Sequence, residues 1–490
     1  MRRHTVKSLL AELPNCRTNI VKDSELKGIT ADSRAVVADG VFVAVRGTAV
    51  DGHSYITKAL QAGATLIVCE SLPENPSGDV NWAVVPDSAY ALGLLASAWY
   101  GHPSRDVELV GVTGTNGKTT VATLLYELAR IRGMKAGLLS TVVNKIDDEE
   151  VKSTHTTPDP ISLNALLARM VEGGCEFVAM EVSSHASDQQ RIAGLDFDGA
   201  IFTNLTRDHL DYHGTFANYL RAKQRFFDVL KPDAFALANV DDKNGEIIMQ
   251  NTRAERKTYS IRRDADFRGK VIENRLDGME IAFNGRAVDM MFAGRFNASN
   301  LTAVFGAACM LGWDDEELLV NMSLLRPVAG RFEPVVGPAG IVAIVDYAHT
   351  PDALANVLDT INEIRIPEQR VITVCGCGGD RDRGKRPIMA AEAALRSWKV
   401  ILTSDNPRSE SPEAIIAEMR TGLNSETAKR TLSLTDRREA IRLATQLASS
   451  GDIILIAGKG HEPYQIIGSE TFHFDDREEV RAAFDELEIK

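Results

Sequence analysis

Short apolar runs that alternate with amphipathic stretches are the main pattern over most of the chain. In the middle part, the runs VELVGVTG, EFVAMEV, GAIFTNL and AFALANV alternate with amphipathic segments such as TVATLLYELARIRG and FANYLRAKQRFFDVL. Further on, GIVAIVDYA, VITVCG, KVILTSD and DIILIAGKG are each followed by a segment that we predict to be helical. This alternation indicates βαβ units and a parallel sheet. We therefore predict an α/β fold in both parts.

Changes in the pattern mark the boundaries of the predicted domains. Residues 1–100 contain the short apolar runs VFVAV, ATLIVCE and WAVV and close with the helical stretch SAYALGLLASAWYG, after which His102-Pro103-Ser104 indicates a linker. The stretch 250–295 is more polar, is predicted to form short alternating strands and resembles an insertion before the helical segment NASNLTAVFGAACML. We predict a smaller N-terminal α/β domain (1–100), a central parallel-sheet domain (101–328) and a C-terminal Rossmann-like domain (329–490).

Length and composition agree with several ordinary globular domains. A chain of 490 residues exceeds what one hydrophobic core usually serves, and 44% hydrophobic and 25% charged residues are typical of folded proteins. The formal net charge of -13 argues against a general nucleic-acid binder, because phosphate backbones are bound by clustered Lys and Arg. Any anionic substrate must therefore be bound by local basic groups.

Cysteine usage and the N-terminus bear on the cellular compartment. The six cysteines show no repeated spacing, which argues against a secreted disulfide framework. The pair Cys375-Gly-Cys377 lacks the second pair that a zinc site needs, and we interpret it as small residues that end a buried strand. Glu12 and Pro14 interrupt the basic N-terminus before an apolar segment develops. We expect a cytoplasmic protein without membrane insertion, and a monomer is our default expectation for this architecture.

A glycine-rich segment follows the first apolar run of the middle part and opens a helix: Gly111-Val-Thr-Gly114-Thr-Asn-Gly117-Lys118-Thr119-Thr120. In such loops, backbone N–H groups and the helix N-terminus attract phosphate, a lysine reaches the outer phosphates and a threonine hydroxyl can bind Mg²⁺. The strict G-x-x-x-x-G-K-[ST] pattern fails, because Val112 stands at the position of its first glycine. A plain glycine turn is the alternative, but we predict a nucleotide site of a less common kind, in a central domain (101–328) that resembles a P-loop ATPase.

Other polar motifs lie at or just after predicted strand ends, where open α/β sheets bind their ligands. Glu181 ends one strand in MEVSSH, and His209 follows the next strand in TNLTRDHLDYHG. Taken alone, Glu181 could be a satisfied carboxylate and His209 a structural histidine. The later motifs, which could equally be helix caps or solvated loops, are NASN at 297–300, GRFE at 330–333, DYAHTPD at 346–352, GCGGDRDRGKRP at 376–387, DNPR at 405–408 and GKGHE at 458–462.

Together and in this order, the motifs resemble those of the Mur ligases, and along the whole chain those of the branch that adds diaminopimelate. The loop GTNGKT is the form seen in Mur ligases and the related folylpolyglutamate synthases, and the likeness is weakest over 1–100 and 250–290. The resemblance implies an ATP-dependent ligase of peptidoglycan precursor synthesis. It would join meso-diaminopimelate to UDP-N-acetylmuramoyl-L-alanyl-D-glutamate through an acyl phosphate, with ATP and Mg²⁺ bound.

The resemblance also implies roles for individual residues, which we carry over as predictions. Catalysis would depend on Lys118, Glu181, His209 and Lys223, and Mg²⁺ would be held by Thr119, Glu181, His209 and Lys223, the last as a carbamate. ATP would contact Gly114, Thr115, Asn116, Gly117, Lys118, Thr119, Thr120, Asn300, Arg331 and Asp346. The UDP-muramoyl dipeptide would contact Ala31, Ser33, Thr48, Thr156, Thr157, Ser183, Gln189 and Arg191. Diaminopimelate would contact Arg381, Asp405, Asn406, Pro407, Arg408, Gly458 and Glu462.

These predictions compete with plainer interpretations and with other protein classes. From its sequence setting alone, Lys223 would be called a surface lysine. An enzyme of the folylpolyglutamate synthase type shares the phosphate loop, but we do not expect it to carry DHLDYHG followed by DNPR. A non-catalytic scaffold would have no chemical reason to keep Lys118, Glu181, His209 and Lys223 together. A P-loop GTPase would need the guanine-binding N-K-x-D, which is absent.

The predicted hinge between the ATP loop and the last domain lies near Arg326-Pro327.

Overall fold

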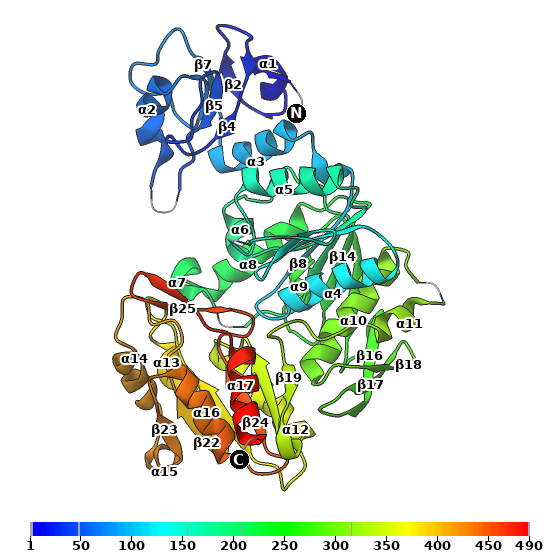
Figure 1. Ribbon diagram of the computed structural model, residues 1–490. Helices are drawn as coiled ribbons and strands as arrows, with labels where there is room; N and C mark the ends of the chain where they lie inside the picture. Colours follow the sequence, from blue (N-terminus) through cyan, green and yellow to red (C-terminus); the bar gives the residue numbers. More distant parts are fainter. Residues whose placement is uncertain (1–2, 48–49, 154, 207, 315, 489–490) are drawn as a thin grey trace.

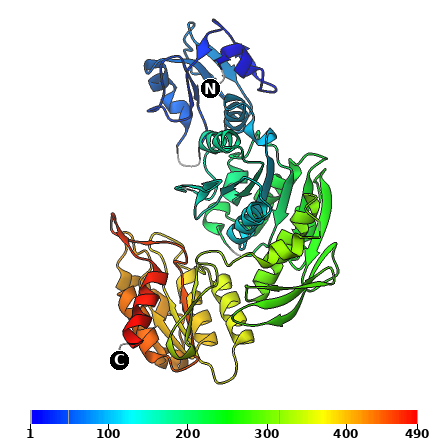
Figure 2. The same ribbon diagram turned by 45° about the vertical axis from the view of Figure 1, so that its right-hand side comes forward.

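The computed structural model describes residues 3–47, 50–153, 155–206, 208–314 and 316–488. Each predicted domain contains a sheet of its own. The sheets follow one another along an elongated molecule, with the N-terminal part at one end and the C-terminal part at the other (Figure 1 and Figure 2). Within the described ranges, no helix is long and apolar enough to cross a membrane.

The N-terminal part is built on a mixed sheet. Its strands run in the order β2 (Arg17–Asn19), β7 (Asn81–Val84), β6 (Ala64–Cys69), β5 (Gly40–Val43) and β4 (Ile29–Thr30), while β1 (His4–Thr5) pairs with β3 (Glu25–Leu26). The predicted apolar runs form β5, β6 and β7. The helices α1 (Val6–Leu10) and α3 (Ser88–Trp99) pack on one face of the sheet, and η1 (Gly52–Tyr55) leads into α2 (Ile56–Gln61) on the other. The predicted linker forms η2 (Pro103–Arg105), in which Pro103 and Ser104 are buried.

The central sheet carries the phosphate loop. Its strands run in the order β11 (Glu149–Val151), β10 (Asn144–Ile146), β9 (Ala136–Leu139), β12 (Phe177–Glu181), β8 (Glu108–Thr113), β13 (Gly199–Phe202), β14 (Phe235–Asn239), β15 (Glu255–Ser260), β16 (Phe267–Asn274), β17 (Met279–Phe283) and β18 (Arg286–Met290). Neighbouring strands from β9 to β16 are parallel. The alternating pattern predicted this for the four apolar runs that form β12, β8, β13 and β14.

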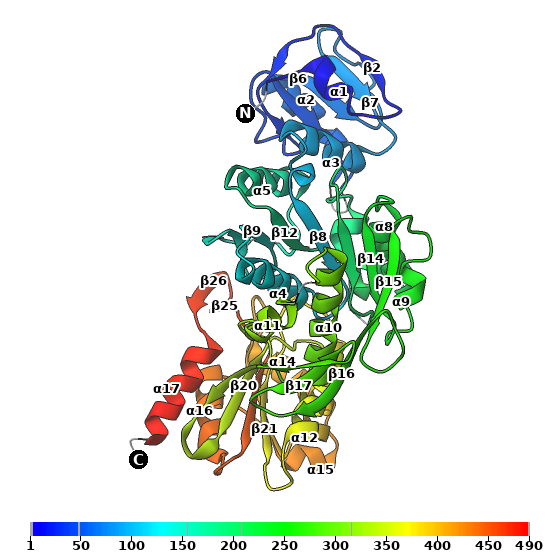
Figure 3. The same cartoon turned by 90° about the vertical axis from the view of Figure 1, so that its right-hand side faces the viewer.

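Helices cover both faces of this sheet. One face packs against α4 (Lys118–Ile131), α10 (Arg295–Met310) and α11 (Leu318–Ser323). The other face packs against α5 (Pro160–Glu172), α8 (Phe216–Asp228) and α9 (Gly245–Ile248) (Figure 3). The short helices α6 (Ser184–Asp188) and α7 (Leu210–His213) lie beside α8 (Figure 1). Along β8, Val110 and Val112 belong to the first hydrophobic layer and Leu109 to the second. Burial on both faces explains why the central strands are continuous apolar runs.

The stretch 250–295 is not a separate insertion, so that prediction was wrong. Strands β15 to β18 extend the central sheet, with β15 parallel to β14 and β17 antiparallel to both of its neighbours. In β17, Met279, Ile281 and Phe283 are buried against α10, and the residues between them are more exposed. One covered face gives an alternating and therefore more polar sequence, and for this reason the stretch resembled an insertion.

The C-terminal sheet is parallel except at one edge. Its strands run in the order β19 (Glu333–Val336), β20 (Val342–Asp346), β24 (Ile453–Ala457), β21 (Val371–Cys375), β22 (Lys399–Leu402) and β23 (Thr431–Ser433), and β19 is antiparallel to β20. A short turn, η3 (Pro338–Gly340), joins β19 to β20. The helices α12 (Pro351–Ile364), α13 (Lys385–Arg396) and α14 (Pro412–Arg420) cover one face, with α15 (Ser425–Lys429) near α13, and α16 (Arg437–Leu447) and α17 (Asp476–Glu488) cover the other.

Two predictions from the sequence concern this sheet: one is confirmed and the other is wrong. Cys375 ends β21 and both cysteines of the pair are buried, as predicted. The expectation that every strand leads directly into a helix is wrong for β24. The hairpin of β25 (Tyr464–Ile467) and β26 (Glu470–His473) comes between β24 and α17, and its residues are mostly exposed.

A fully buried ion pair ties α16 to α17. The guanidinium of Arg437 donates to both oxygens of Asp476 at 2.8 and 2.7 Å, and neither side chain is exposed. Because Arg437→Met would leave an uncompensated buried carboxylate, we expect it to lower the free energy of unfolding by ~3–5 kcal/mol, measured by denaturant unfolding of the C-terminal part. Arg437→Met combined with Asp476→Leu should recover most of that loss. A single variant as stable as the parent would show that the pair contributes nothing.

Candidate active site

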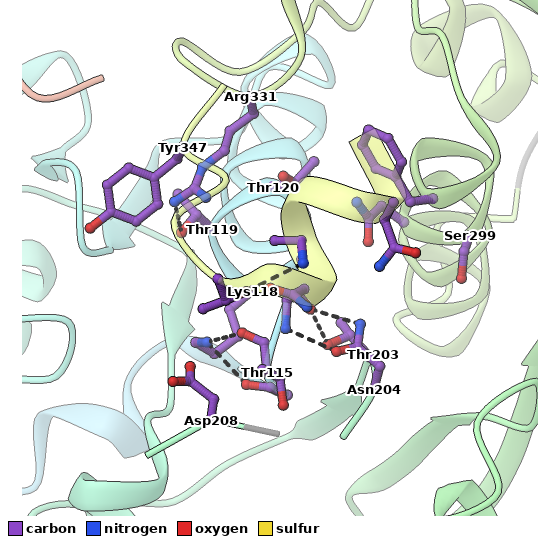
Figure 4. A pocket seen from close by; sticks show the side chains of 18 of the residues that line it. Thr115, Lys118, Thr119, Thr120, Thr203, Asn204, Asp208, Ser299, Arg331 and Tyr347 are labelled. Carbon is purple, nitrogen blue, oxygen red and sulfur yellow. Dashed lines mark hydrogen bonds between the residues drawn. The ribbon is translucent and has the colours of Figure 1, made fainter. Parts of the chain in front are cut away.

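A cavity of about 790 Å³ lies between the central and C-terminal parts (Figure 4). Its walls include the segments that follow β8, β12 and β13 in the central sheet, and the segment that follows β20 together with one side of α12. Parallel strands thus place their carboxyl ends at this cavity from both sheets, as expected for ligand sites in open α/β folds.

The predicted phosphate loop forms one wall of the cavity. Gly114 has a φ of 152°, and a Cβ there would lie 1.9 Å from Oγ1 of Thr203. Gly117 has a φ of 88°, and a Cβ there would lie 2.6 Å from Oδ1 of Asn300. Both positions therefore require glycine, for conformation and for space. The N-terminus of α4 follows directly, which gives the arrangement that binds phosphate groups.

Two lysines meet at one carbonyl of this loop. Lys118 donates from Nζ to the carbonyl oxygens of Gly114 and Thr115 at 3.0 and 2.9 Å, and Lys223 donates to that of Gly114 at 2.9 Å. Lys223 lies on α8 and is only 1% exposed. Burial and then the charge of Lys118 lower the pKa of Lys223 well below its usual value. The site therefore pairs a cation on the phosphate loop with an amine that is driven toward its neutral form.

Side chains suited to Mg²⁺ line the same cavity. Both oxygens of Glu181 accept hydrogen bonds from Thr141, from its backbone N at 2.8 Å and its hydroxyl at 3.2 Å. Oγ1 of Thr119 accepts from Arg331 at 3.1 Å, which leaves a second lone pair for a cation. In the described part of the chain, no group of three or more His, Cys, Asp or Glu side chains could hold a metal. Mg²⁺ commonly uses few protein oxygens and completes its shell with water and phosphate, so Glu181 and Thr119 fit it.

His209 stands at the start of α7, on the edge of the cavity. Its Nε2 lies 3.4 Å from a carboxylate oxygen of Asp208, and its ring centroid lies 4.9 Å from that of His185. Because Mg²⁺ prefers oxygen ligands to imidazole, His209 is better suited to hold a cation-bound water than the cation itself.

The C-terminal part contributes the other predicted ATP residues. Arg331 donates to Thr119 and its guanidinium lies 4.5 Å from the ring centre of Tyr347, while Asn116 donates to Asp352 at 3.3 Å. Asp346 is buried and accepts from the backbone N–H groups of Phe332 and Ala348, both at 2.7 Å. The structure thus brings the predicted ATP residues of both parts, including Asn300, onto one cavity, with direct contacts across it.

The predicted residues for the UDP-muramoyl dipeptide are only partly brought together. Thr156, Thr157, Ser183 and Arg191 line the cavity, and Gln189 accepts from Arg191 at 2.7 and 3.0 Å beside it. Two further predicted residues, Ala31 and Ser33, follow β4 in the N-terminal part and do not line the cavity. The prediction for Thr48 lies outside the described residues.

The predicted diaminopimelate residues form a second group beside the cavity, where β21, β22 and β24 end. Asn406 donates to Glu462 at 2.9 Å and accepts from Lys459 at 2.9 Å. Arg408 has a φ of 52°, an uncommon conformation for a residue with a side chain, and donates from Nη1 to the Gly379 carbonyl at 3.0 Å. The same carboxyl ends carry Arg381, Asp405, Pro407 and Gly458, and none of this group lines the cavity.

Several residues of the site had no role in the sequence predictions. Thr141 orients Glu181, and Lys459 is fully buried between Asp405 and Asn406. Tyr347 lies within 3.4 Å of Glu462 through its hydroxyl and also lines the cavity, so it joins the two groups of residues. Lys459 and Tyr347 belong to motifs quoted above, but no pattern in the sequence predicts that the side chain of Lys459 is buried or that Tyr347 lines the cavity. Thr141 follows β9 without any recognisable motif.

Comparisons with known proteins match these observations. The model of the Mur ligase middle domain matches residues 112–308, that of the Mur ligase glutamate ligase domain matches 330–460, and that of the Mur ligase family catalytic domain matches 25–100. The central and C-terminal matches contain the walls of the cavity.

Curated relatives and solved structures resemble the chain over nearly its whole length. The UDP-N-acetylmuramoyl-L-alanyl-D-glutamate–2,6-diaminopimelate ligase of Parabacteroides distasonis is 59% identical over 94% of this chain and 95% of its own. The enzyme of that name from Bacteroides fragilis is 54% identical over 98% and 99%. A solved structure bearing the same enzyme name has a TM-score of 0.70 at 33% identity, over 99% and 100%. The chain belongs to the Mur ligase family, which confirms the resemblance drawn from its motifs.

Proposed function

We propose that this chain joins meso-2,6-diaminopimelate to UDP-N-acetylmuramoyl-L-alanyl-D-glutamate with hydrolysis of ATP to ADP and phosphate. The observation that carries the proposal is the single cavity that combines the phosphate loop, Lys118, Glu181 and Arg331, with the DNPR residues directly beside it. The family match and relatives named for this reaction support it. They favour it over a folylpolyglutamate synthase, a GTPase and a non-catalytic scaffold.

The proposed reaction places an activated carboxylate within the cavity. The substrate carboxylate attacks the γ-phosphorus of ATP, ADP leaves, and the acyl phosphate is then attacked by the amine, with phosphate as the leaving group. The work of the protein is positioning and charge neutralisation, by Lys118 and Arg331 at the phosphates and Arg191 near the carboxylate substrate. Bound Mg²⁺ would neutralise phosphate charge, with Thr119 and Glu181 as its protein ligands.

Lys223 has a specific place in this proposal as a carbamate. Uptake of CO₂ requires a neutral amine, and both burial and the neighbouring Lys118 lower the pKa of Lys223. The carbamate would be an anion beside Lys118, so the charge repulsion at the Gly114 carbonyl would become an attraction. Its oxygens would add to the ligands suited to Mg²⁺.

The proposed amino-acid specificity rests on Arg408. Its Nη1 is bound to the Gly379 carbonyl, while no described residue accepts a hydrogen bond from its Nε or Nη2. These two groups form one edge of the guanidinium, which can bind a carboxylate through parallel hydrogen bonds. Diaminopimelate carries a carboxylate that lysine lacks, so lysine would leave this edge without its partner. Glu462, which accepts from Asn406, would bind an ammonium group of the amino acid.

Arg408→Ala is therefore expected to lower kcat/KM for diaminopimelate by a factor that corresponds to about 2–5 kcal/mol of transition-state free energy. The KM values of ATP and the UDP substrate should change little. Steady-state kinetics with each substrate varied in turn would measure this. Arg442, a half-buried arginine on α16 that pairs with Glu486, gives a matched control, because Arg442→Ala removes the same side chain away from the site. If kcat/KM fell by a similar factor for all three substrates, Arg408 would contribute to folding and not to recognition of diaminopimelate.

The proposed function is tested by the identity of the product. Purified protein with ATP, Mg²⁺, the UDP-muramoyl dipeptide and meso-diaminopimelate should give the UDP-muramoyl tripeptide in mass spectra. With L-lysine in place of diaminopimelate, kcat/KM should be about 10⁴–10⁵-fold lower. Comparable kcat/KM for the two amino acids would contradict the specificity. Absence of any peptide product would contradict the ligase assignment.

A further inference from the structure

The imidazole of His349 occupies a position between the phosphate site and the predicted amino-acid site. It follows β20 on the C-terminal side and lines the cavity that contains the phosphate loop. Its electrostatic neighbours include Asp208 in the central part and Asp405 of the DNPR motif. The adjacent Tyr347, whose ring lies 4.6 Å from that of His349, bridges to Glu462. Through Tyr347, the predicted amino-acid site at Glu462 is thus connected to the cavity wall that carries His349.

A hydrogen bond fixes which ring nitrogen of His349 carries the proton. Nδ1 lies 2.9 Å from the backbone carbonyl oxygen of Tyr347. A carbonyl oxygen can only accept, so Nδ1 must be the N–H donor. In the neutral ring, Nε2 then carries the lone pair. Among the described residues, none forms a hydrogen bond with Nε2, so that atom is available to a substrate.

The surroundings of His349 keep the ring neutral near pH 7. Burial and the cation of Lys385 lower its pKa from the usual value of a histidine, with a smaller contribution from Arg331. The carbonyl of Tyr347 and the carboxylate of Asp208 act in the opposite direction and limit the shift. A neutral imidazole with a free Nε2 is ready to accept a proton.

We propose that His349 is the catalytic base that deprotonates the incoming amine, an inference that rests on the proposed ligase function. The ammonium group gives one proton to Nε2, and the nitrogen lone pair that this frees forms the C–N bond to the acyl carbon. The bond between that carbon and the phosphate oxygen breaks, and its electron pair leaves with phosphate. The second proton of the attacking nitrogen leaves with the phosphate, and Nε2 returns its own proton to solvent.

Other titratable groups near the amino-acid site are less suited to this role. Glu462 accepts from Asn406, and Asp405 lies 3.4 Å from the ammonium group of Lys459, so each is engaged with a neighbouring side chain. His461 is a weak base, because burial and then Arg331 lower its pKa to about 3. Asp208 is paired with His209 at the metal side of the cavity.

The test separates amine deprotonation from formation of the acyl phosphate. Hydroxylamine is already unprotonated at neutral pH, so it can trap the acyl phosphate as a hydroxamate without a base. We expect His349→Asn and His349→Gln to lower the rate of diaminopimelate addition about 10²–10⁴-fold. Both variants should form the hydroxamate, dependent on ATP and the UDP substrate, within about threefold of the parent, a limit well inside the contribution of a general base.

Each possible result either supports or contradicts the role of His349 as the catalytic base. His473→Asn, at an exposed histidine of β26, is the matched control and should leave both rates unchanged. If diaminopimelate addition persists in the His349 variants, or if both rates fall together in both variants, His349 is not the base. If the parent forms no hydroxamate with ATP and the UDP substrate, the proposed ligase function itself fails, and that result is distinct from the loss of transfer alone.

Discussion

Lys118→Ala is expected to abolish product formation. The side chain stands at the start of α4, and its Nζ lies against the Gly114 and Thr115 carbonyls at the cavity (Figure 4). Without it, the negative charge on the transferring γ-phosphoryl group would lack its nearest protein cation. The measurement is kcat for ADP release in the presence of all substrates.

The control for this prediction is an exposed lysine away from the cavity, and Lys429→Ala on α15 serves as one. Its kcat should equal that of the parent protein. If Lys118→Ala retains more than about a tenth of kcat, a loss of at most about 1.4 kcal/mol, Lys118 does not bind the γ-phosphate in the transition state.

Lys223→Ala should be nearly inactive and should regain part of its activity with formate or acetate. The lysine is 1% exposed, next to the phosphate loop, and its low pKa favours the neutral amine that CO₂ needs. A small carboxylate can enter the space left by the side chain and supply the missing anion. Activity would be measured against carboxylate concentration at constant ionic strength.

Rescue should be specific to this site. Lys118→Ala should not respond to formate or acetate, because it lacks a cation rather than an anion. A fully active Lys223→Ala protein would contradict the role of Lys223. An unmodified amine in a well-resolved crystal structure would contradict the carbamate.

Helical periodicity contained more information about Lys223 than we drew from it. In α8, the buried residues Tyr219, Ala222, Phe226 and Phe227 share one face, and Lys223 lies on that same face. This spacing follows the i, i+3, i+4, i+7 rule, so a lysine among these positions is predicted to point inward. The pattern alone predicts a buried lysine, and the family resemblance was needed only for its chemistry.

Most of the strand–helix order in the central and C-terminal parts, and the phosphate loop within it, followed from the sequence because these elements have strong local patterns. The exceptions are strands β15 to β18 and the hairpin after β24. Contacts between distant segments did not. Arg331 donating to Thr119, Asn116 to Asp352 and Thr141 to Glu181 join residues far apart in the chain, and no local pattern encodes them. The separation of the DNPR group from the main cavity was also not predictable, because it depends on how side chains turn at the strand ends.

The coupling of phosphate release to both substrates tests the proposed ligase most directly. Phosphate release from ATP would be measured with no addition, with the UDP-muramoyl dipeptide, with meso-diaminopimelate and with both. We predict sustained release only with both, at one phosphate for each tripeptide formed, because the acyl phosphate needs the first substrate and its turnover needs the second. Equal release in the absence of either substrate would contradict the assignment as a ligase.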